Sequence, residues 1–311
     1  MDPSSLSPLL SNLLIASNRS TRLRDRVNDF IDLTRPRVLV LVLLTAPPAF
    51  AMGHEGWPSF LTMFGVVLGA ALIGAGSGAI NAWWERELDG LMERTQDRPL
   101  PSKRLTPTEA LLFGVGVSLA GLLVLHLTTT PMATAIGAYT LLHYVLVYTI
   151  WAKPRSPQNI VIGGIAGAAA PLIADAAVDG RIGVWGLVLF AIVFIWQPPH
   201  FWAITLYRKR EYEAAGFPMM PSVVGNGPTR KRSLAYAILL LPVMLLPWFG
   251  GVLSGFYAAT AFLGGSHFIY CIVQSMREDS DEADRRVFRS SIICLGALFL
   301  EMTLELCLQT L

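Results

Sequence analysis

The stretch NAWWERELD, residues 81–89, is the part of this sequence that decides the fold and the predicted site. It ends a long apolar run that begins near Trp57, and it places Asn81, Glu85 and Asp89 four residues apart. On a helix these positions lie on one face, so their oxygen-bearing side chains form a stripe. Two acids at this spacing destabilise an isolated helix by roughly 0.2–0.5 kcal/mol. The stripe therefore predicts either a bound Mg²⁺ or Ca²⁺ ion, by ligand type, or a solvated helix end.

The composition around this stretch indicates an integral membrane protein. Of the 311 residues, 53% are hydrophobic and only 15% are charged, with a net charge of +2 and a mean hydropathy of +0.51. Soluble domains are about 25% charged. Cys271, Cys294 and Cys307 fall in apolar segments without CxxC or HExxH spacing, so we expect buried thiols rather than a zinc site or disulfides. We expect no nucleic-acid partner.

Nine apolar stretches are long enough to cross a bilayer, which takes about 20 residues. They lie at 37–53, 59–84, 108–128, 131–151, 159–178, 183–206, 233–250, 253–274 and 289–309. The Pro47-Pro48 pair predicts a kink or an interfacial end in the first stretch. We therefore expect an all-α membrane protein with a cytoplasmic lead-in at 1–36 and a nine-helix domain at 37–309. Acids in the lead-in argue against a mitochondrial transit peptide, and it has no apolar segment of secretory type.

The basic residues predict which side of the membrane each loop occupies. With the N-terminus in the cytoplasm, nine alternating spans place 23 of the 24 Lys and Arg residues on the cytoplasmic side, Arg181 being the exception. This asymmetry follows the positive-inside rule and predicts an external C-terminus. Because the cytoplasmic loops are also the long polar ones, we expect the functional site there.

Three polar segments on that side predict one site. In the first, basic residues follow the acidic stripe up to Leu105, an order that suits a metal-bound diphosphate. In the second, Lys153 follows the fourth span, where a ligand role and a topological role fit equally well. The glycines after it, at 163, 164 and 167, predict close helix packing.

The third segment runs from the sixth span into a second cluster of charged residues at 208–213. Pro198-Pro199 is predicted to break the sixth helix near its cytoplasmic end. His200 then follows the break, where it could act as a base, orient a substrate or bind an iron. The isolated His126, His143 and His267 are expected to be satisfied core histidines.

Taken together, these segments resemble the UbiA-type intramembrane prenyltransferases, whose first motif is N-x-x-x-D-x-x-x-D. The matching stretches are NAWWERELD with RTQDRPLPSKRL, then NIVIGGIAGAAAPLI, then WQPPHFWA through EYEAAGFPMMP, and the resemblance spans roughly residues 30–305. WQPPHFWA resembles the heme-farnesylating branch in particular. The sequence departs from the usual pattern at Glu85 and Glu211, where aspartate is common.

The resemblance implies a helical bundle around a central cavity, with farnesyl diphosphate as donor, heme B as acceptor and Mg²⁺ as cofactor. It implies that Asn81, Glu85 and Asp89 hold Mg²⁺ and are catalytic, with Glu211 as a further metal ligand and His200 as a further catalytic residue. The substrate-binding residues that it implies are Arg94, Arg98, Lys103, Lys153, Arg208, Lys209, Glu211 and Tyr212. The expected location is the bacterial inner membrane rather than the mitochondrial one.

Other functions fit the sequence less well. A UbiA-type enzyme with a quinone-precursor or chlorophyllide acceptor shares the acidic motif but not WQPPHFWA. A secondary transporter would place charges near the midplane and show inverted repeats, whereas these charges gather at one surface. The sequence leaves open the oligomeric state, ligation of heme iron by His200, and contact with heme A synthase or oxidase-assembly factors.

Overall fold

A computed structural model describes residues 24–309 apart from 37–39, 41–42, 53 and 55. Within this part of the chain all regular structure is helical. Eight helical segments are long and apolar enough to cross a membrane. They are α4 (Phe60–Trp84), α6 (Pro107–Thr128), α7 (Pro131–Leu142) with η2 (His143–Ala152), α8 (Asn159–Gly167) with α9 (Ala170–Asp179), α10 (Val184–Tyr207), α13 (Asn226–Phe249), α14 (Gly255–Glu278) and α15 (Asp281–Gln309).

The first expected span, 37–53, is not among these eight segments. Its described part contains the short helix α3 (Pro47–Ala51), while 37–39, 41–42 and 53 lie outside the described residues. Proline fits the first turn of α3 because no backbone N–H is needed there. Ala49 and Phe50 are buried, and α3 contacts α9, α10 and α15. The count of nine spans therefore stays a prediction.

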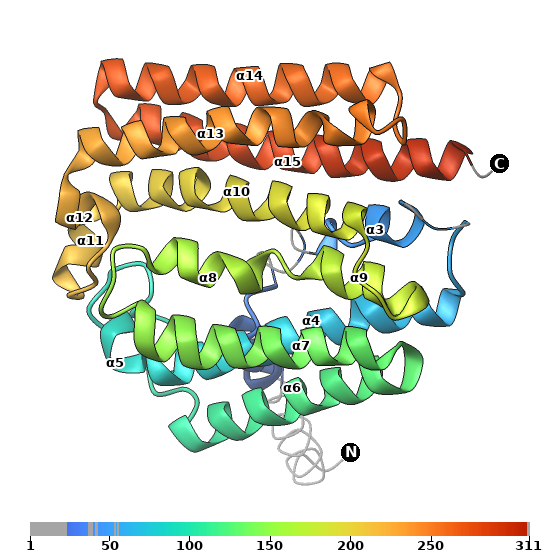
Figure 1. The fold of residues 1–311 in the computed structure, drawn as a ribbon. Coiled ribbons are helices and arrows are strands. Elements are labelled where there is room, and N and C mark those ends of the chain that lie inside the picture. The colour runs from blue at the N-terminus through green and yellow to red at the C-terminus, as the bar shows by residue number, and fades with distance from the viewer. Residues whose placement is uncertain (1–23, 37–39, 41–42, 53, 55, 310–311) are drawn as a thin grey trace, which may run out of the picture.

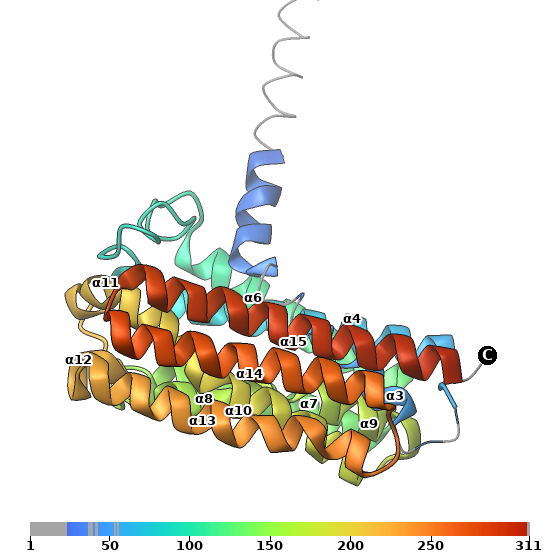
Figure 2. The same cartoon turned by 90° about the horizontal axis from the view of Figure 1, so that it is seen from above.

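The long helices form one bundle (Figures 1 and 2). α13, α14 and α15 lie together on one side and α6 and α7 on the other, with α8, α9 and α10 between them. α4 packs mainly on α6, where glycines let the two backbones approach. A Cβ at Gly76 would lie 2.5 Å from the carbonyl oxygen of Gly114, and one at Gly121 would lie 2.8 Å from that of Gly69. Small residues at contacts of this kind are typical of helices in membranes.

The fourth expected span contains a change of helix type. α7 continues into η2, a π-helical segment that ends where the amide of Lys153 donates to the carbonyl of Tyr148 at 2.9 Å. π-Helical turns are rare and often occur at functional sites. Thr149 in this segment contacts Asn81, and Lys153 at its end contacts Glu85.

We call one end of the bundle the motif end: it holds residues 81–106, Lys153, and the segment 208–221 with α11 (Lys209–Ala214). The helix at 24–33 joins the bundle here and projects from it (Figure 2). Asp29 on this helix accepts a hydrogen bond from Arg104 at 2.8 Å, and the Phe30 ring lies 4.9 Å from that of Phe113.

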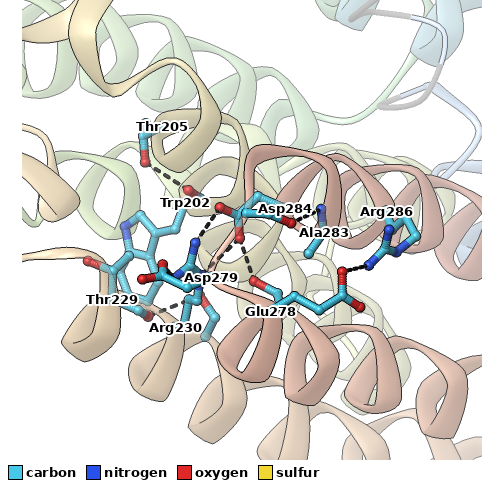
Figure 3. Close-up of polar contacts among 12 residues, drawn as sticks. Trp202, Thr205, Thr229, Arg230, Glu278, Asp279, Ala283, Asp284 and Arg286 are labelled. Carbon is cyan, nitrogen blue, oxygen red and sulfur yellow. Dashed lines mark hydrogen bonds and ion pairs between the residues drawn. The ribbon is translucent and has the colours of Figure 1, made fainter.

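A buried ion pair joins the last three helices near their motif ends (Figure 3). Arg230 on α13 donates to both oxygens of Asp284 on α15, at 3.0 and 2.7 Å, and also to Asp279. The Ser275 hydroxyl on α14 donates to Asp284 as well. Arg230 is 4% exposed and Asp284 1%. The network therefore connects α13, α14 and α15 through one bidentate pair.

Candidate functional site

Asn81, Glu85 and Asp89 lie on one face where α4 passes into α5 (Arg86–Asp89), which confirms the predicted stripe. The amide of Glu85 donates to the carbonyl of Asn81 at 2.9 Å, and that of Asp89 donates to the carbonyl of Glu85 at 2.8 Å. Helical spacing is thus kept across the junction. The three residues are 0%, 3% and 2% exposed. The alternative of a solvated helix end is therefore wrong.

Each carboxylate of the stripe is paired with a cation from further along the chain. Lys153 Nζ donates to Glu85 Oε2 at 2.6 Å, and Arg98 Nη1 donates to Asp89 Oδ2 at 2.8 Å. An unpaired buried charge would cost several kcal/mol, so these pairs explain how two acids can be buried one helical turn apart. Lys153 thus contacts the acidic stripe, which the sequence alone did not predict.

The side chain of Asn81 has an acceptor that is not used. Its Nδ2 donates to Glu85 Oε1 at 2.8 Å and to Thr149 Oγ1 at 3.1 Å. Because a carboxylate can only accept, this contact fixes the amide with its oxygen on the other side. Asn81 Oδ1 is buried without a hydrogen-bond partner among the described residues. Such atoms are rare in folded proteins, and here the unpaired atom is an oxygen of the kind that Mg²⁺ binds.

The second acidic cluster lies against the first loop. Arg208 Nη1 donates to Glu211 Oε1 at 2.8 Å, and Arg94 from the first loop places Nε 3.9 Å from Glu211 Oε2. That second oxygen is buried and has no hydrogen-bond partner within the described chain. Met92 packs with Phe217 and with partly buried Tyr212. Arg94 therefore connects the loop after the first acidic cluster to Glu211 of the second.

Arg35 lies within electrostatic reach of the acidic stripe, whereas the sequence interpretation counted it only as a topology signal. Burial lowers the pKa of its guanidinium, but the fields of Tyr144, Glu85 and Asp89 raise that pKa by more. Burial and the charge of Arg35 both lower the pKa of Arg98, against the pull of Asp89. The cations Arg35, Arg94, Arg98, Lys153 and Arg208 therefore outnumber the carboxylates Glu85, Asp89 and Glu211. This excess favours an anionic ligand.

Two of the predicted substrate contacts lie outside this arrangement. Lys103 is exposed in the loop after the stripe, with a left-handed backbone at φ 60°, and it makes no ion pair within the described part of the chain. Lys209 places Nζ 3.7 Å from Glu213 rather than near Glu211. Neither residue lies with the buried acids in this conformation.

His200 is buried in α10, but the predicted helix break before it is wrong. α10 runs without interruption from Val184 to Tyr207 and contains both Pro198 and Pro199. The helix continues because α8, α13 and α15 pack along it, so packing outweighs the backbone hydrogen bonds that the prolines remove. His200 is therefore held by a rigid helix rather than by a freed segment.

The contacts of His200 fix which ring nitrogen carries the proton. Ser291 Oγ donates its only proton to the carbonyl of Phe288 at 2.6 Å, and it lies 2.7 Å from His200 Nδ1. The serine oxygen must therefore accept from Nδ1–H, which leaves Nε2 with its lone pair. The imidazole also stacks on Trp196 at 4.2 Å between ring centroids. A neutral histidine with an available Nε2 can accept a proton or bind a metal.

The residues present fit a divalent cation that arrives together with an anion. No three His, Cys, Asp or Glu side chains among the described residues already lie close enough to hold a metal ion. Instead, Lys153 and Arg98 donate to oxygens of Glu85 and Asp89, while Asn81 Oδ1 and Glu211 Oε2 accept no hydrogen bond from the described residues. When a metal binds the two carboxylates, Lys153 and Arg98 could pair with phosphate oxygens instead.

The sequence interpretation missed Thr149 and Arg35. Thr149 holds Asn81 from η2, and no pattern in the sequence marks a π-helical turn. Arg35 precedes the first apolar stretch, where a basic residue is expected on topological grounds. His126 and His267 are exposed, so the prediction that they are core histidines was wrong. The same prediction is confirmed for His143, which is buried and contacts the Ile162 carbonyl at 2.8 Å.

Comparison with known proteins shows which family the chain matches. The UbiA prenyltransferase family matches residues 40–299. The chain is 40% identical over 304 residues to the protoheme IX farnesyltransferase of Methylorubrum extorquens, covering 95% of this chain and 96% of that protein. It is 42% identical over 287 residues to the protein of the same name from Methylobacterium radiotolerans, covering 90% and 89%.

Solved structures resemble the fold at low sequence identity. A UbiA homolog from Archaeoglobus fulgidus bound to DMAPP and Mg²⁺ superposes with a TM-score of 0.70 at 14% identity, covering 89% of this chain and 98% of that chain. A digeranylgeranylglyceryl phosphate synthase gives a TM-score of 0.73 at 17% identity, covering 91% and 99%. At these identities the likeness establishes the fold.

Proposed function

The chain belongs to the UbiA prenyltransferase family, and from that membership we propose that it transfers the farnesyl group of farnesyl diphosphate to a vinyl group of heme B, giving heme O. Heme as the acceptor is supported by the 40% identity, over 95% of the chain, to a protein named protoheme IX farnesyltransferase. The motif end supports a diphosphate donor, because the buried acids Glu85 and Asp89 lie there with an excess of partly exposed cations, which suits a metal-bound diphosphate.

Mg²⁺ is the proposed cofactor, held by Asn81, Glu85, Asp89 and Glu211. When bound, the metal would neutralise charge on the leaving diphosphate. Two buried oxygens that accept no hydrogen bond from the described residues, Asn81 Oδ1 and Glu211 Oε2, support this assignment. Glu85 is one methylene longer than aspartate, but Lys153 and Asn81 hold its two oxygens in place. Its length therefore does not exclude Glu85 as a metal ligand.

The cations of the site assist loss of the diphosphate. Lys153, Arg98, Arg94 and Arg208 are placed to bind its oxygens, and the C1–O bond of the farnesyl group breaks with the electron pair leaving on the diphosphate. The terminal carbon of the heme vinyl group then bonds to the allylic cation. Water adds to the resulting cation beside the porphyrin ring and loses a proton. The products are hydroxyethylfarnesyl heme and diphosphate.

The membrane arrangement remains a proposal in its finer points. We propose a lead-in at 1–36 and one prenyltransferase domain at 37–309, with nine spans, a cytoplasmic N-terminus and an external C-terminus. The eight apolar helices and the asymmetry of the basic residues support this arrangement. Bacterial relatives support the inner membrane as the location. Contact with heme A synthase or oxidase-assembly factors is part of the proposal, as partners that would take up the product.

A product assay tests the proposed function directly. Protein purified in detergent is incubated with Mg²⁺, farnesyl diphosphate and heme B, and the heme fraction is analysed by chromatography and mass spectrometry. We expect a heme heavier by one hydroxyfarnesyl group, formed only when Mg²⁺ is present and lost when it is chelated. If product forms with 4-hydroxybenzoate but not with heme, heme is not the acceptor, and only the assignment as a prenyltransferase stands.

His200 and Ser291 offer a second test. We expect His200→Ala to cause a large loss of turnover, because the heme would lose the Nε2 that is available to it. Ser291→Ala should cause a smaller loss, roughly tenfold, since the imidazole would keep its place on Trp196 but not its tautomer.

Ser291 would act through His200, so its role is positioning. Ser291→Thr keeps the hydroxyl and should restore turnover, which a merely structural defect at this contact would not do. The matched control is Thr303→Ala on the same helix, where the hydroxyl donates only to the carbonyl of Phe299 at 2.8 Å. Equal effects of the Ser291 and Thr303 variants would contradict the positioning role.

A further inference from the structure

A polar groove runs between α14 and α15, on the outer side of the bundle. Its cavity volume is about 520 Å³, and His267, Cys271, Glu278, Arg286, Arg289 and Ser290 are among the residues that line it. α14 packs mainly on α13 and α15 and lies at one edge of the bundle (Figure 1). The groove shares no residue with the motif-end site.

The groove follows from the periodicity of two antiparallel helices. His267, Cys271 and Glu278 recur on one face of α14, at i, i+4 and i+11. Arg286, Arg289 and Ser290 recur on the facing side of α15, at i, i+3 and i+4. Both helices are apolar enough to cross a membrane, so these polar side chains interrupt surfaces that otherwise carry exposed Tyr270 and Ile293. His267 and Cys271 lie within the expected span 253–274, where an ionisable group is usually functional, whereas Glu278, Arg286 and Arg289 lie toward the proposed cytoplasmic ends of the two helices.

The two ends of the groove differ in chemistry. Toward the middle of α14, Cys271 Sγ lies 3.6 Å from His267 Nε2. Toward the motif end, Arg286 pairs with Glu278 (Figure 3), and Arg289 lies 3.6 Å from Glu282. Cys271 and Glu278 are seven residues apart, about 10.5 Å along the helix. A ligand here would meet His267 and Cys271 at one end and, at the other, guanidinium groups that are paired with Glu278 and Glu282.

Ser290 lines the groove, but its hydroxyl oxygen is buried, so a ligand in the groove does not reach it. Ser290 is 5% exposed, and its hydroxyl has no hydrogen-bond partner within the part of the chain that the structure describes. The next residue, Ser291, faces His200 on the other side of α15. The groove and the proposed heme contact in α10 are therefore separated by one helix.

We propose that this groove is a second heme site, where the acceptor is held at the membrane-facing surface outside the motif-end site. The inference rests on the proposed function, because heme is the acceptor of that reaction. An iron porphyrin has a flat apolar ring, a metal that histidine or cysteine can ligate, and two carboxylates at one edge. His267 supplies the iron ligand beside Cys271, and Arg286 and Arg289 bind the carboxylates.

Size and the side chains of His267 and Cys271 favour this occupant over an anionic lipid. The cavity is within the range of small-molecule sites, about 300–1,000 Å³. A lipid phosphate would use the two arginines near the surface, and it would leave His267 and Cys271 without a role. The ring would instead cover these residues, with Tyr270 and Ile293 against its apolar surface.

Heme titration without farnesyl diphosphate tests the site separately from turnover. Purified protein is titrated with heme B and followed by the Soret absorbance, which gives the number of hemes bound and their affinity. We expect His267→Leu to lose one heme equivalent, and Arg289→Gln to weaken binding of that equivalent roughly tenfold. The matched control is His126→Leu, an exposed histidine of α6 outside the groove, which should titrate like the wild type.

The outcomes separate the two proposals. Asp89→Asn should lose product formation but keep the groove heme. If His267→Leu and the wild type bind the same number of hemes with the same affinity while product still forms, the groove site is wrong and the proposed function stands. If the wild type forms no heme product, the proposed function fails, whatever the titration shows. Loss of co-purified phosphatidylglycerol in Arg289→Gln, with an unchanged heme titration, would assign the groove to lipid and overturn the proposal.

Discussion

Asp89→Asn is expected to reduce turnover by at least about 10²–10³-fold, the loss seen when one preorganised group at a developing charge is removed. Asp89 is 2% exposed and accepts from Arg98 at 2.8 Å. Asparagine keeps the shape but removes the negative charge that would bind Mg²⁺ and hold Arg98 against the diphosphate. The measurement is the rate of heme product formation in detergent at saturating substrates.

A companion measurement separates loss of metal from loss of fold. In the wild type, Mg²⁺ with farnesyl diphosphate should raise the thermal unfolding midpoint, because a ligand that binds only the folded state stabilises it. Asp89→Asn should lose this rise while keeping a cooperative transition. The control is Asp97→Asn, an exposed acid in the same loop, which should behave like the wild type. Normal turnover in Asp89→Asn would remove Asp89 from the metal site.

Arg230→Met is expected to have the largest effect on stability, about 3–5 kcal/mol, because it leaves Asp284 buried without its cation. Arg230 donates to both Asp284 oxygens, and the pair connects α13 to α15 (Figure 3). Thermal or denaturant unfolding in detergent, followed by circular dichroism, would measure the loss. Turnover of the protein that remains folded should change much less, because the pair lies outside the motif-end site.

Removing both charges distinguishes an unpaired charge from lost packing. The double variant Arg230→Met with Asp284→Leu should recover most of the stability, since apolar groups can replace a buried ion pair at little cost. Arg277→Met, at an exposed position near the end of α14, is the matched control and should be close to neutral. An unchanged unfolding midpoint in Arg230→Met would show that this pair does not hold the three helices together.

Most of the helical architecture could be predicted because its signals are local. Apolar stretches of membrane length predicted the eight segments found, and the expected stretch 131–151 begins at the residue where α7 begins. Prediction was less successful at the ends of helices. α13 begins at Asn226 and α15 at Asp281, both before the apolar stretches begin, because charged residues in their first two turns are paired or exposed.

The helix break at Pro198-Pro199 was the clearest wrong prediction. The rule that proline breaks helices describes an isolated segment, which has nothing to replace the missing hydrogen bonds. In α10 both prolines are buried, and three neighbouring helices hold the backbone in place. The consequence for His200 is considerable, since its orientation depends on Ser291 from α15, 91 residues away.

The sequence by itself determined that this is a helical membrane protein, that Asn81, Glu85 and Asp89 share one face, and that the charges gather at one end. These properties depend on composition and on a period of 3.6 residues, which are present in any short window. Only the tertiary structure decided which cations pair with the buried acids. Lys153 reaches Glu85 across 68 residues from the end of a π-helical turn.

The groove between α14 and α15 was also decided by the tertiary structure. Its polar residues look isolated along the chain, and they form one surface only because the two helices pack antiparallel in one register. The physical reason is the same in both cases. A buried or membrane-facing polar group is stable only with a partner, and which partner is available depends on how distant segments pack.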